Sequence, residues 1–353
     1  MTIRMKNDKK CKVFFALAGM MIFLTGCGRG GQENINLGMD AVAQMEYEQA
    51  LSCFENALAK GEDNRLLYRG QGLAYMGLTQ YEEAAQSFEK ALANSEVIVD
   101  DLDYDINYYL ATAYYKSGDL AKAVNVYDAI LALKDTERDA YFLRGAVLLE
   151  QGNYDAAIQD FDKTISLDKK DYGQLISIYQ VLEKNGYKQV GQEYLQAAID
   201  ADEKSMTDYE HGRISYYLED YASASTYLER ARANGDEETI LYLGKTYEAL
   251  GDYNYASSVY NSYLAEHTDS EQMYNQLGLC MMKMGNYEEA LAVFQAGMNV
   301  ENNSMLQTLQ FNEIVAYEYL SEYKKAAVLM ESYLKTYPGD EAAQRENIFL
   351  QTR

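Results

Sequence analysis

The sequence predicts an all-α protein built as an elongated array of about nine helical hairpins. Its 353 residues exceed what one hydrophobic core usually supports, roughly 250 to 300 residues, so the chain forms several domains or an array. It contains 1 Pro, whereas turn-rich all-β folds and disordered linkers use more of it. A hydrophobic content of 48% excludes wholesale disorder. The third observation is a short phrase that recurs along the chain at a nearly constant spacing.

The first 26 residues have the pattern of a targeting signal. Five Lys and Arg up to Lys12 precede the apolar run 13–24, VFFALAGMMIFL. This run is shorter than the ~20 residues that span a bilayer as a helix. Basic, apolar and then small residues in succession predict a secretory signal, which is excluded from the fold.

The end of this segment, Leu24-Thr25-Gly26-Cys27, resembles the lipobox of bacterial lipoproteins. The resemblance implies cleavage before Cys27 and a diacylglyceride on its thiol, and stable anchoring then takes more than one acyl chain. Residues 27–33 would form the lipidated Cys and a flexible, Gly-rich tether. The alternative is an ordinary signal peptide in which Cys27 is incidental.

The recurring phrase reads Tyr-Glu-Gln-Ala at its first copy and Tyr-Glu-Glu-Ala at its second. Its first residue, called the anchor here, occurs nine times, with spacings of 34, 39, 34, 33, 34, 32, 34 and 36 residues. The anchors are Tyr47, Tyr81, Leu120, Tyr154, Tyr187, Tyr221, Tyr253, Tyr287 and Tyr323. They place the repeat array at residues 34–340.

Each copy carries two small positions and one bulky position. A Gly or Ala stands nine residues before most anchors, and Ala stands three residues after eight of them. Helices cross closely only where side chains are small, so these positions mark the contact between the two helices of a hairpin. Seven residues after the anchor stands a bulky group such as Phe54, which we expect to fill the space between successive hairpins. Gly118, Gly152, Gly251 and Gly285 are expected in left-handed turns between helices.

A period near 34 with these residues resembles the tetratricopeptide repeat, a helix-turn-helix unit. The resemblance covers about residues 31–340 and implies an all-α, right-handed superhelical solenoid of about nine repeats. It also implies a scaffold whose first helices line a concave groove for a protein or peptide.

Three departures from the pattern stand out. The family's Pro after the second helix occurs once, as Pro338, and five extra residues fall around 94–104. The fifth copy places Ile178 and Val190 in both small positions. We therefore expect a bend or flexible point near 94–104 or within 171–204. Residues 341–353 are expected to form a capping helix, in which Ile348 and Phe349 cover the last hairpin.

No constellation of residues indicates catalysis. The chain has 2 His and 4 Cys, without the spacing of a metal site or of a nucleophile with its base. We therefore expect no enzyme, no cofactor and no metal. A formal charge of −24 disfavours nucleic acid, because phosphate binding needs clustered cations.

The expected groove is rich in aromatic residues. Its candidate residues are Tyr108, Tyr115, Phe142, Tyr179, Tyr209, Arg213, Tyr216, Tyr217, Phe311 and Tyr319. Further cations there are Arg69, Lys116, Lys245 and Lys283. Aromatic rings with a few cations suit an extended peptide that carries an acidic residue. The alternative is that many of these Tyr pack against the neighbouring repeat.

These features predict a lipid-anchored scaffold at the extracytoplasmic side of a bacterial cell membrane, with a protein or peptide as its partner. The alternative function is an envelope assembly factor, similar to repeat lipoproteins that serve outer-membrane barrel insertion or pilus secretin assembly.

Overall fold

The computed structural model describes residues 31–96, 98–202 and 205–353. The expected signal at 1–26 and Cys27 lie outside the described residues. The described part contains nineteen α-helices, one short 3-10 helix and no strand, which confirms the all-α repeat fold. In chain order the α-helices are α2 (Glu33–Ala43), α3 (Tyr47–Lys60), α4 (Asn64–Gly77), α5 (Tyr81–Ala93), α6 (Asp101–Ser117), α7 (Leu120–Leu133), α8 (Arg138–Glu150), α9 (Tyr154–Leu167), α10 (Tyr172–Lys184), α11 (Lys188–Asp202), α12 (Asp208–Tyr217), α13 (Tyr221–Ala231), α14 (Glu237–Ala249), α15 (Tyr253–Leu264), α16 (Glu271–Met284), α17 (Tyr287–Met298), α18 (Leu306–Tyr319), α19 (Tyr323–Thr336) and α20 (Glu341–Leu350).

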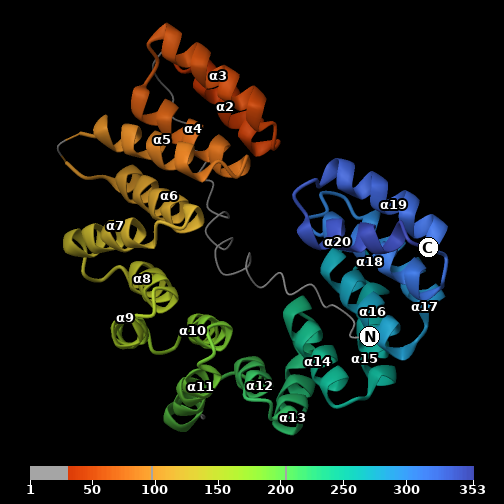
Figure 1. Cartoon of the computed structure of the whole chain (residues 1–353). Helices are drawn as coiled ribbons and strands as arrows, with labels where there is room; N and C mark the ends of the chain where they lie inside the picture. The colour runs from red at the N-terminus through yellow and green to blue at the C-terminus, as the bar shows by residue number, and fades with distance from the viewer. Residues whose placement is uncertain (1–30, 97, 203–204) are drawn as a thin grey trace. The chain divides into compact units, whose positions relative to one another are not determined.

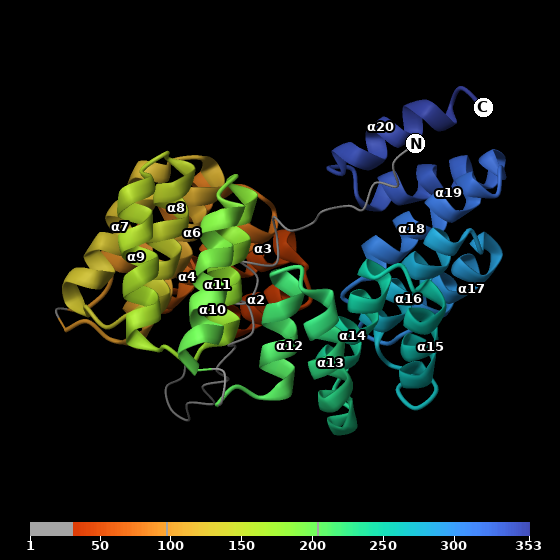
Figure 2. The ribbon, with the colours of Figure 1, turned by 90° about the horizontal axis from the view of Figure 1, so that it is seen from below.

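The chain divides into two compact units, one ending at Gly191 and the other running from Gln192 to Arg353. Within each unit, successive helices pack as hairpins: α4 on α5, α6 on α7, α14 on α15 and α16 on α17. In the first unit, α6, α8 and α10 lie on one side of the stack, with α7 and α9 on the other (Figure 1). Figure 2 shows α8, α9 and α10 side by side in this stack.

The anchor begins the second helix of the hairpin in eight of the nine copies, from Tyr47 of α3 to Tyr323 of α19. The residue two positions before each second helix has a positive φ, because the chain must reverse within a tight turn. Gly118 and Gly251, with φ of 88° and 83°, confirm the expected left-handed turns. Thr79 and Ser321 adopt the same conformation without being Gly, at φ of 61° and 60°.

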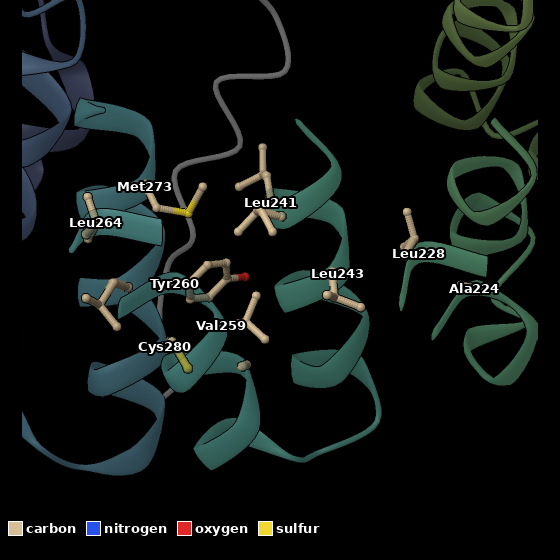
Figure 3. Close-up of a cluster of buried hydrophobic side chains, with 12 residues drawn as sticks. Ala224, Leu228, Leu241, Leu243, Val259, Tyr260, Leu264, Met273 and Cys280 are labelled. Carbon is tan, nitrogen blue, oxygen red and sulfur yellow. The ribbon is translucent and has the colours of Figure 1, made fainter. Parts of the chain in front are cut away.

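The bulky position packs directly on the small one. A Cβ at Gly244 of α14 would lie 2.2 Å from the Tyr260 ring of α15, so only Gly admits that ring. Phe54 lies against two first helices, since a Cβ would meet its ring at 2.6 Å from Gly38 and at 2.4 Å from Gly70. The bulky residue therefore fills the space within its own hairpin and toward the next. Figure 3 shows Tyr260 inside such a cluster, with Met273 and Cys280 of α16 beside it.

The fifth copy is shifted by one residue from the alignment on Tyr187. The expectation that Ile178 and Val190 occupy its two small positions was therefore wrong. Its second helix begins at Lys188, and Gly186 is the left-handed residue, with φ of 87°. The small residue is Gly191, whose Cβ would lie 3.1 Å from the Tyr179 Cα. The first helix thus presents Tyr179 and the second helix presents Gly, the reverse of the usual arrangement.

The extra residues between copies two and three form a connection and a longer first helix, α6, of 17 residues. Asp100 and Asp103 cap this helix reciprocally. Arg65 of α4 binds both carboxylates and so ties the start of α6 to the preceding hairpin. Whether the array bends at 94–104 or within 171–204 stays a prediction.

The last helix, α20, is capped by Asp340, whose carboxylate accepts from the backbone N–H groups of Ala342 and Ala343. Contrary to expectation, Ile348 does not cover the last hairpin, because 66% of it is exposed. Leu350 is buried instead and joins the terminal cluster with Ala343. Phe349 packs against the same cluster, as expected, with its ring centroid 6.4 Å from that of Tyr323.

Candidate peptide-binding face

The first helices of successive hairpins contact one another within each unit. In the first unit α2 contacts α4 and α4 contacts α6, and in the second unit α12, α14, α16 and α18 contact in series. Side chains that point away from the second helices therefore gather on one continuous face per unit, called the first-helix face here. In the second unit, α14, α16 and α18 follow one another along this side in Figure 1.

Three of the candidate aromatic residues belong to the core. Phe142, Tyr179 and Phe311 are 6%, 2% and 7% exposed. Phe142 packs against Phe161 with the ring centroids 6.3 Å apart, and Phe311 against Tyr333 at 5.9 Å. A partner could not insert side chains between these rings without opening the hairpins.

Two candidates in the first unit link neighbouring repeats. Tyr108 and Tyr115 of α6 donate to Glu137 and Glu150 at the two ends of α8, over 3.2 and 2.7 Å. Burial, together with the adjacent carboxylate, raises the pKa of both phenols. These contacts agree with the interpretation in which tyrosines pack against the next repeat.

Tyr319 is half-buried at the end of α18, in the second unit. Its ring lies 4.9 Å from that of Tyr287, the first residue of α17. Burial raises the pKa of its phenol. It stands apart from the four remaining candidates.

Those four candidates lie together on α12. Tyr209, Arg213, Tyr216 and Tyr217 are all half-buried, and Tyr242 of α14 joins them. We call these five residues the tyrosine–arginine cluster. The helix that carries four of them begins with a reciprocal cap between Thr207 and Glu210, which fixes its start.

The rings of the cluster contact one another edge to face. Tyr216 lies 5.5 Å from both Tyr217 and Tyr242, at interplanar angles of 84° and 73°. The hydroxyls of Tyr217 and Tyr242 share a hydrogen bond of 2.9 Å. These contacts hold the side chains in fixed positions before any partner arrives.

Arg213 is the cation of the cluster. Its guanidinium carbon lies 5.8 Å from the Tyr209 ring centroid and 5.3 Å from that of Tyr242. Its Nε is buried and has no hydrogen-bond partner among the described residues. The carboxylate of Glu238 on α14 accepts from the Tyr209 hydroxyl. Within the described part of the chain, no carboxylate forms an ion pair with Arg213.

Other candidate cations of the first helices are neutralised within the chain. Arg69 binds Asp105, and Lys283 binds Glu248 over 2.7 Å. Lys245 lies with its Nζ 5.5 Å from the Tyr242 centroid, on the helix that faces Arg213. Arg213 differs from Arg69 and Lys283 because, among the described residues, it forms no ion pair, although Glu238 lies near enough to act on its charge.

Sequence reasoning found four members of the cluster and missed Tyr242. Tyr242 stands two residues before the small position Gly244, an offset that carries none of the predicted groove residues. In the preceding repeat that offset is occupied by Glu210, so the repeat pattern offers no signal for Tyr242, and only the packing of α14 beside α12 identifies it. The binding role of the candidates stays a prediction.

Across the ranges that the structure describes, no three His, Cys, Asp or Glu side chains gather as a metal site would require. None of the helices in these ranges combines the length and apolar character that a bilayer span needs.

Two family models match the chain. The model described as Tetratricopeptide repeat matches residues 35–97 and 108–172. The model described as Anaphase-promoting complex, cyclosome, subunit 3 matches residues 217–297.

Similar proteins agree with the repeat assignment. A TPR repeat-containing protein of Methanocaldococcus jannaschii is 24% identical over 263 residues, which are 66% of this chain and 43% of that protein. The Hsp70-Hsp90 organizing protein of Triticum aestivum is 22% identical over 236 residues, 65% of this chain and 40% of that protein. The chain thus spans about two fifths of the length of these relatives.

Among solved structures, yeast Tom70 superposes with a TM-score of 0.50 over 90% of this chain and 80% of Tom70, at 13% identity. This likeness concerns the fold alone. Together with the observed helix pairs, it shows that the chain folds as stacked helical hairpins, and the tetratricopeptide repeat model matches two segments of the first half.

Proposed function

We propose that this protein is a lipid-anchored scaffold at the extracytoplasmic side of a bacterial membrane, and that it holds a protein or peptide on its first-helix face. The observation that carries the binding part is the tyrosine–arginine cluster, a group of half-exposed, mutually fixed rings on two adjacent first helices. The likeness of the Leu24-Thr25-Gly26-Cys27 segment to a lipobox supports the anchor.

The chemistry of the cluster suits recognition rather than catalysis. Tyrosine rings offer a large contact area at a low entropic cost, because few torsions need to be fixed on binding. The contacts among the rings of α12 and α14 remove part of that cost in advance. An extended peptide segment could then insert its side chains into the spaces between the rings.

The binding part is tested by selecting peptides from a phage-displayed library of random 12-residue segments on the immobilised protein. We expect Tyr209→Ala with Tyr216→Ala to weaken binding of the selected peptides about tenfold or more, since truncating an important interface ring costs upward of about 1 kcal/mol and about 1.4 kcal/mol corresponds to a factor of ten. The matched control is Tyr263→Ala, a half-buried tyrosine on the second helix α15. Equal loss in both variants would place binding elsewhere.

The anchor is tested separately by Cys27→Ser, with Cys53→Ser as the control. Cys27→Ser should move the protein from the membrane fraction to the soluble fraction, because no acyl chain can then be attached. Membrane residence and normal processing of the Cys27→Ser protein would contradict the anchor.

A further inference from the structure

We propose that Arg213 is the recognition point for a carboxylate, so that the segment bound on this face carries an Asp or Glu side chain that docks between Tyr209 and Tyr242. This inference rests on the proposed function and narrows its partner to an acidic peptide segment.

The first argument is the unmet hydrogen-bonding capacity of Arg213. A guanidinium carries five N–H donors in one plane, and a carboxylate can accept two of them in parallel. The Nε–H of Arg213 is buried and has no hydrogen-bond partner among the described residues. A buried donor without an acceptor is unfavourable, and a carboxylate that displaced the side chains covering it would remove that penalty.

The second argument is the contrast in charge. The chain has 55 Asp and Glu against 31 Lys and Arg, so acidic partners for its cations are abundant. Arg65 contacts two carboxylates, and Arg144 contacts Asp128 at 2.6 Å and Asp160 at 2.7 Å. At the tyrosine–arginine cluster, by contrast, Glu238 of α14 accepts a hydrogen bond from the Tyr209 hydroxyl and forms no ion pair with Arg213. Glu238 therefore acts on Arg213 only from a distance, and among the described residues no carboxylate contacts the guanidinium directly.

The third argument is the surroundings of the guanidinium. The Tyr209 and Tyr242 rings lie within 6 Å of it, where they stabilise its charge by cation–π attraction and also exclude water. A charge pair at a partly desolvated site is stronger than one in open water. Lys245, 5.5 Å from the same Tyr242 ring, adds a second positive charge to this region. An acidic side chain is therefore favoured locally although the whole protein is anionic.

The occupant is a peptide side chain rather than a small free acid because the flanking rings offer apolar contact beyond the charge. Tyr216 and Tyr217 continue the surface along α12, next to Tyr242. A peptide segment with an acidic residue flanked by apolar residues would make both the charged contact with Arg213 and the apolar contacts with the rings.

The experiment repeats the library selection in parallel on the intact protein and on two variants, Arg213→Gln and Arg230→Gln. Arg230 is the matched control, because it lies 5.3 Å from the Tyr227 ring but is exposed on the second helix α13. We expect peptides selected on the unmodified protein and on Arg230→Gln to be enriched in Asp or Glu at one position. We expect that enrichment to vanish with Arg213→Gln.

The best selected peptide is then labelled with fluorescein, and its binding is measured by anisotropy beside its Glu→Gln or Asp→Asn counterpart. The unmodified protein should prefer the acid about tenfold or more, in line with a charge-assisted hydrogen bond. Arg213→Lys should retain part of the preference, since it keeps the charge and loses the planar pair of donors. Circular dichroism checks that each variant keeps its helices.

The outcomes separate the two proposals. Selected peptides without an acid preference, or the same preference in Arg213→Gln, would overturn the assignment of Arg213 and leave peptide binding intact. Failure to select any peptide on the unmodified protein would overturn both.

Discussion

The Tyr260 hydroxyl donates to a carboxylate oxygen of Glu248 over 2.7 Å, inside the core of the second unit. Gln276 donates to the same oxygen over 2.8 Å, and Lys283 reaches the other oxygen over 2.7 Å. Glu248 is 6% exposed, so its charge depends on these three donors. Burial and the adjacent Glu248 charge raise the pKa of Tyr260, which keeps the phenol protonated as a donor. One acid thereby joins α14, α15 and α16.

We expect Glu248→Ala to lower the free energy of unfolding by about 3 kcal/mol, because it leaves three donors without an acceptor and one of them charged. Tyr260→Phe should cost about 1 kcal/mol, since it removes one donor and keeps the ring on Gly244. Urea unfolding followed by circular dichroism measures both. A smaller cost for Glu248→Ala than for Tyr260→Phe would contradict the shared network.

Gly244→Ala should destabilise the second unit by about 1 to 3 kcal/mol, because its Cβ would lie 2.2 Å from the Tyr260 ring and force the hairpin apart. Gly339→Ala is the control, since nothing lies within 4 Å of a Cβ there. Thermal unfolding compares the two variants. Equal thermal unfolding midpoints for the two variants would show that the hairpin accommodates the added Cβ without losing stability.

Thr79→Gly should stabilise the first unit by about 1 kcal/mol. Thr79 is exposed and holds φ at 61°, a conformation that is unfavourable for a β-branched residue and free for Gly. Leu78→Gly, at φ of −79°, serves as the control and should not stabilise. A lower unfolding midpoint for Thr79→Gly would refute the argument from backbone strain.

The packing of the C-terminal helix α20 should weaken as the pH rises from about 4.5 to about 8. Burial, and then the neighbouring carboxyl of Glu346 on α20, raises the pKa of Glu318 on α18 to about 8. Because the folded pKa lies above the usual value of 4.5, the proton on this pair contributes stability at acidic pH. That contribution falls as the pH rises from about 4.5 and is lost above about 8.

Glu318→Gln should therefore remove this pH dependence and raise the unfolding midpoint relative to the unmodified protein at pH 9. Glu341→Gln, an exposed position at the start of α20, is the control. Thermal scans between pH 5 and pH 9 provide the measurement, and an unchanged slope in Glu318→Gln would contradict the assignment.

The repeat spacing and the small and bulky positions determined the all-α hairpin fold. They suffice because each hairpin is formed by local contacts, such as Phe54 on Gly38, whose partners recur at fixed offsets along the chain. The left-handed turns at Gly118 and Gly251 follow from the same local logic.

Contacts between helices determined two features that the repeat pattern did not specify, the register of the fifth copy and the exposure of the candidate aromatic residues. The register of the fifth copy depends on Gly191 approaching the Tyr179 backbone, whereas the sequence presents a conspicuous Tyr187 one residue too early. The candidate aromatic residues looked equivalent in the sequence, but packing buried Phe142 and gathered three others around Arg213, together with Tyr242 of the next hairpin. Periodicity specifies which face of a helix a residue occupies, while its exposure and its partners depend on the neighbouring hairpin, which only the tertiary structure supplies.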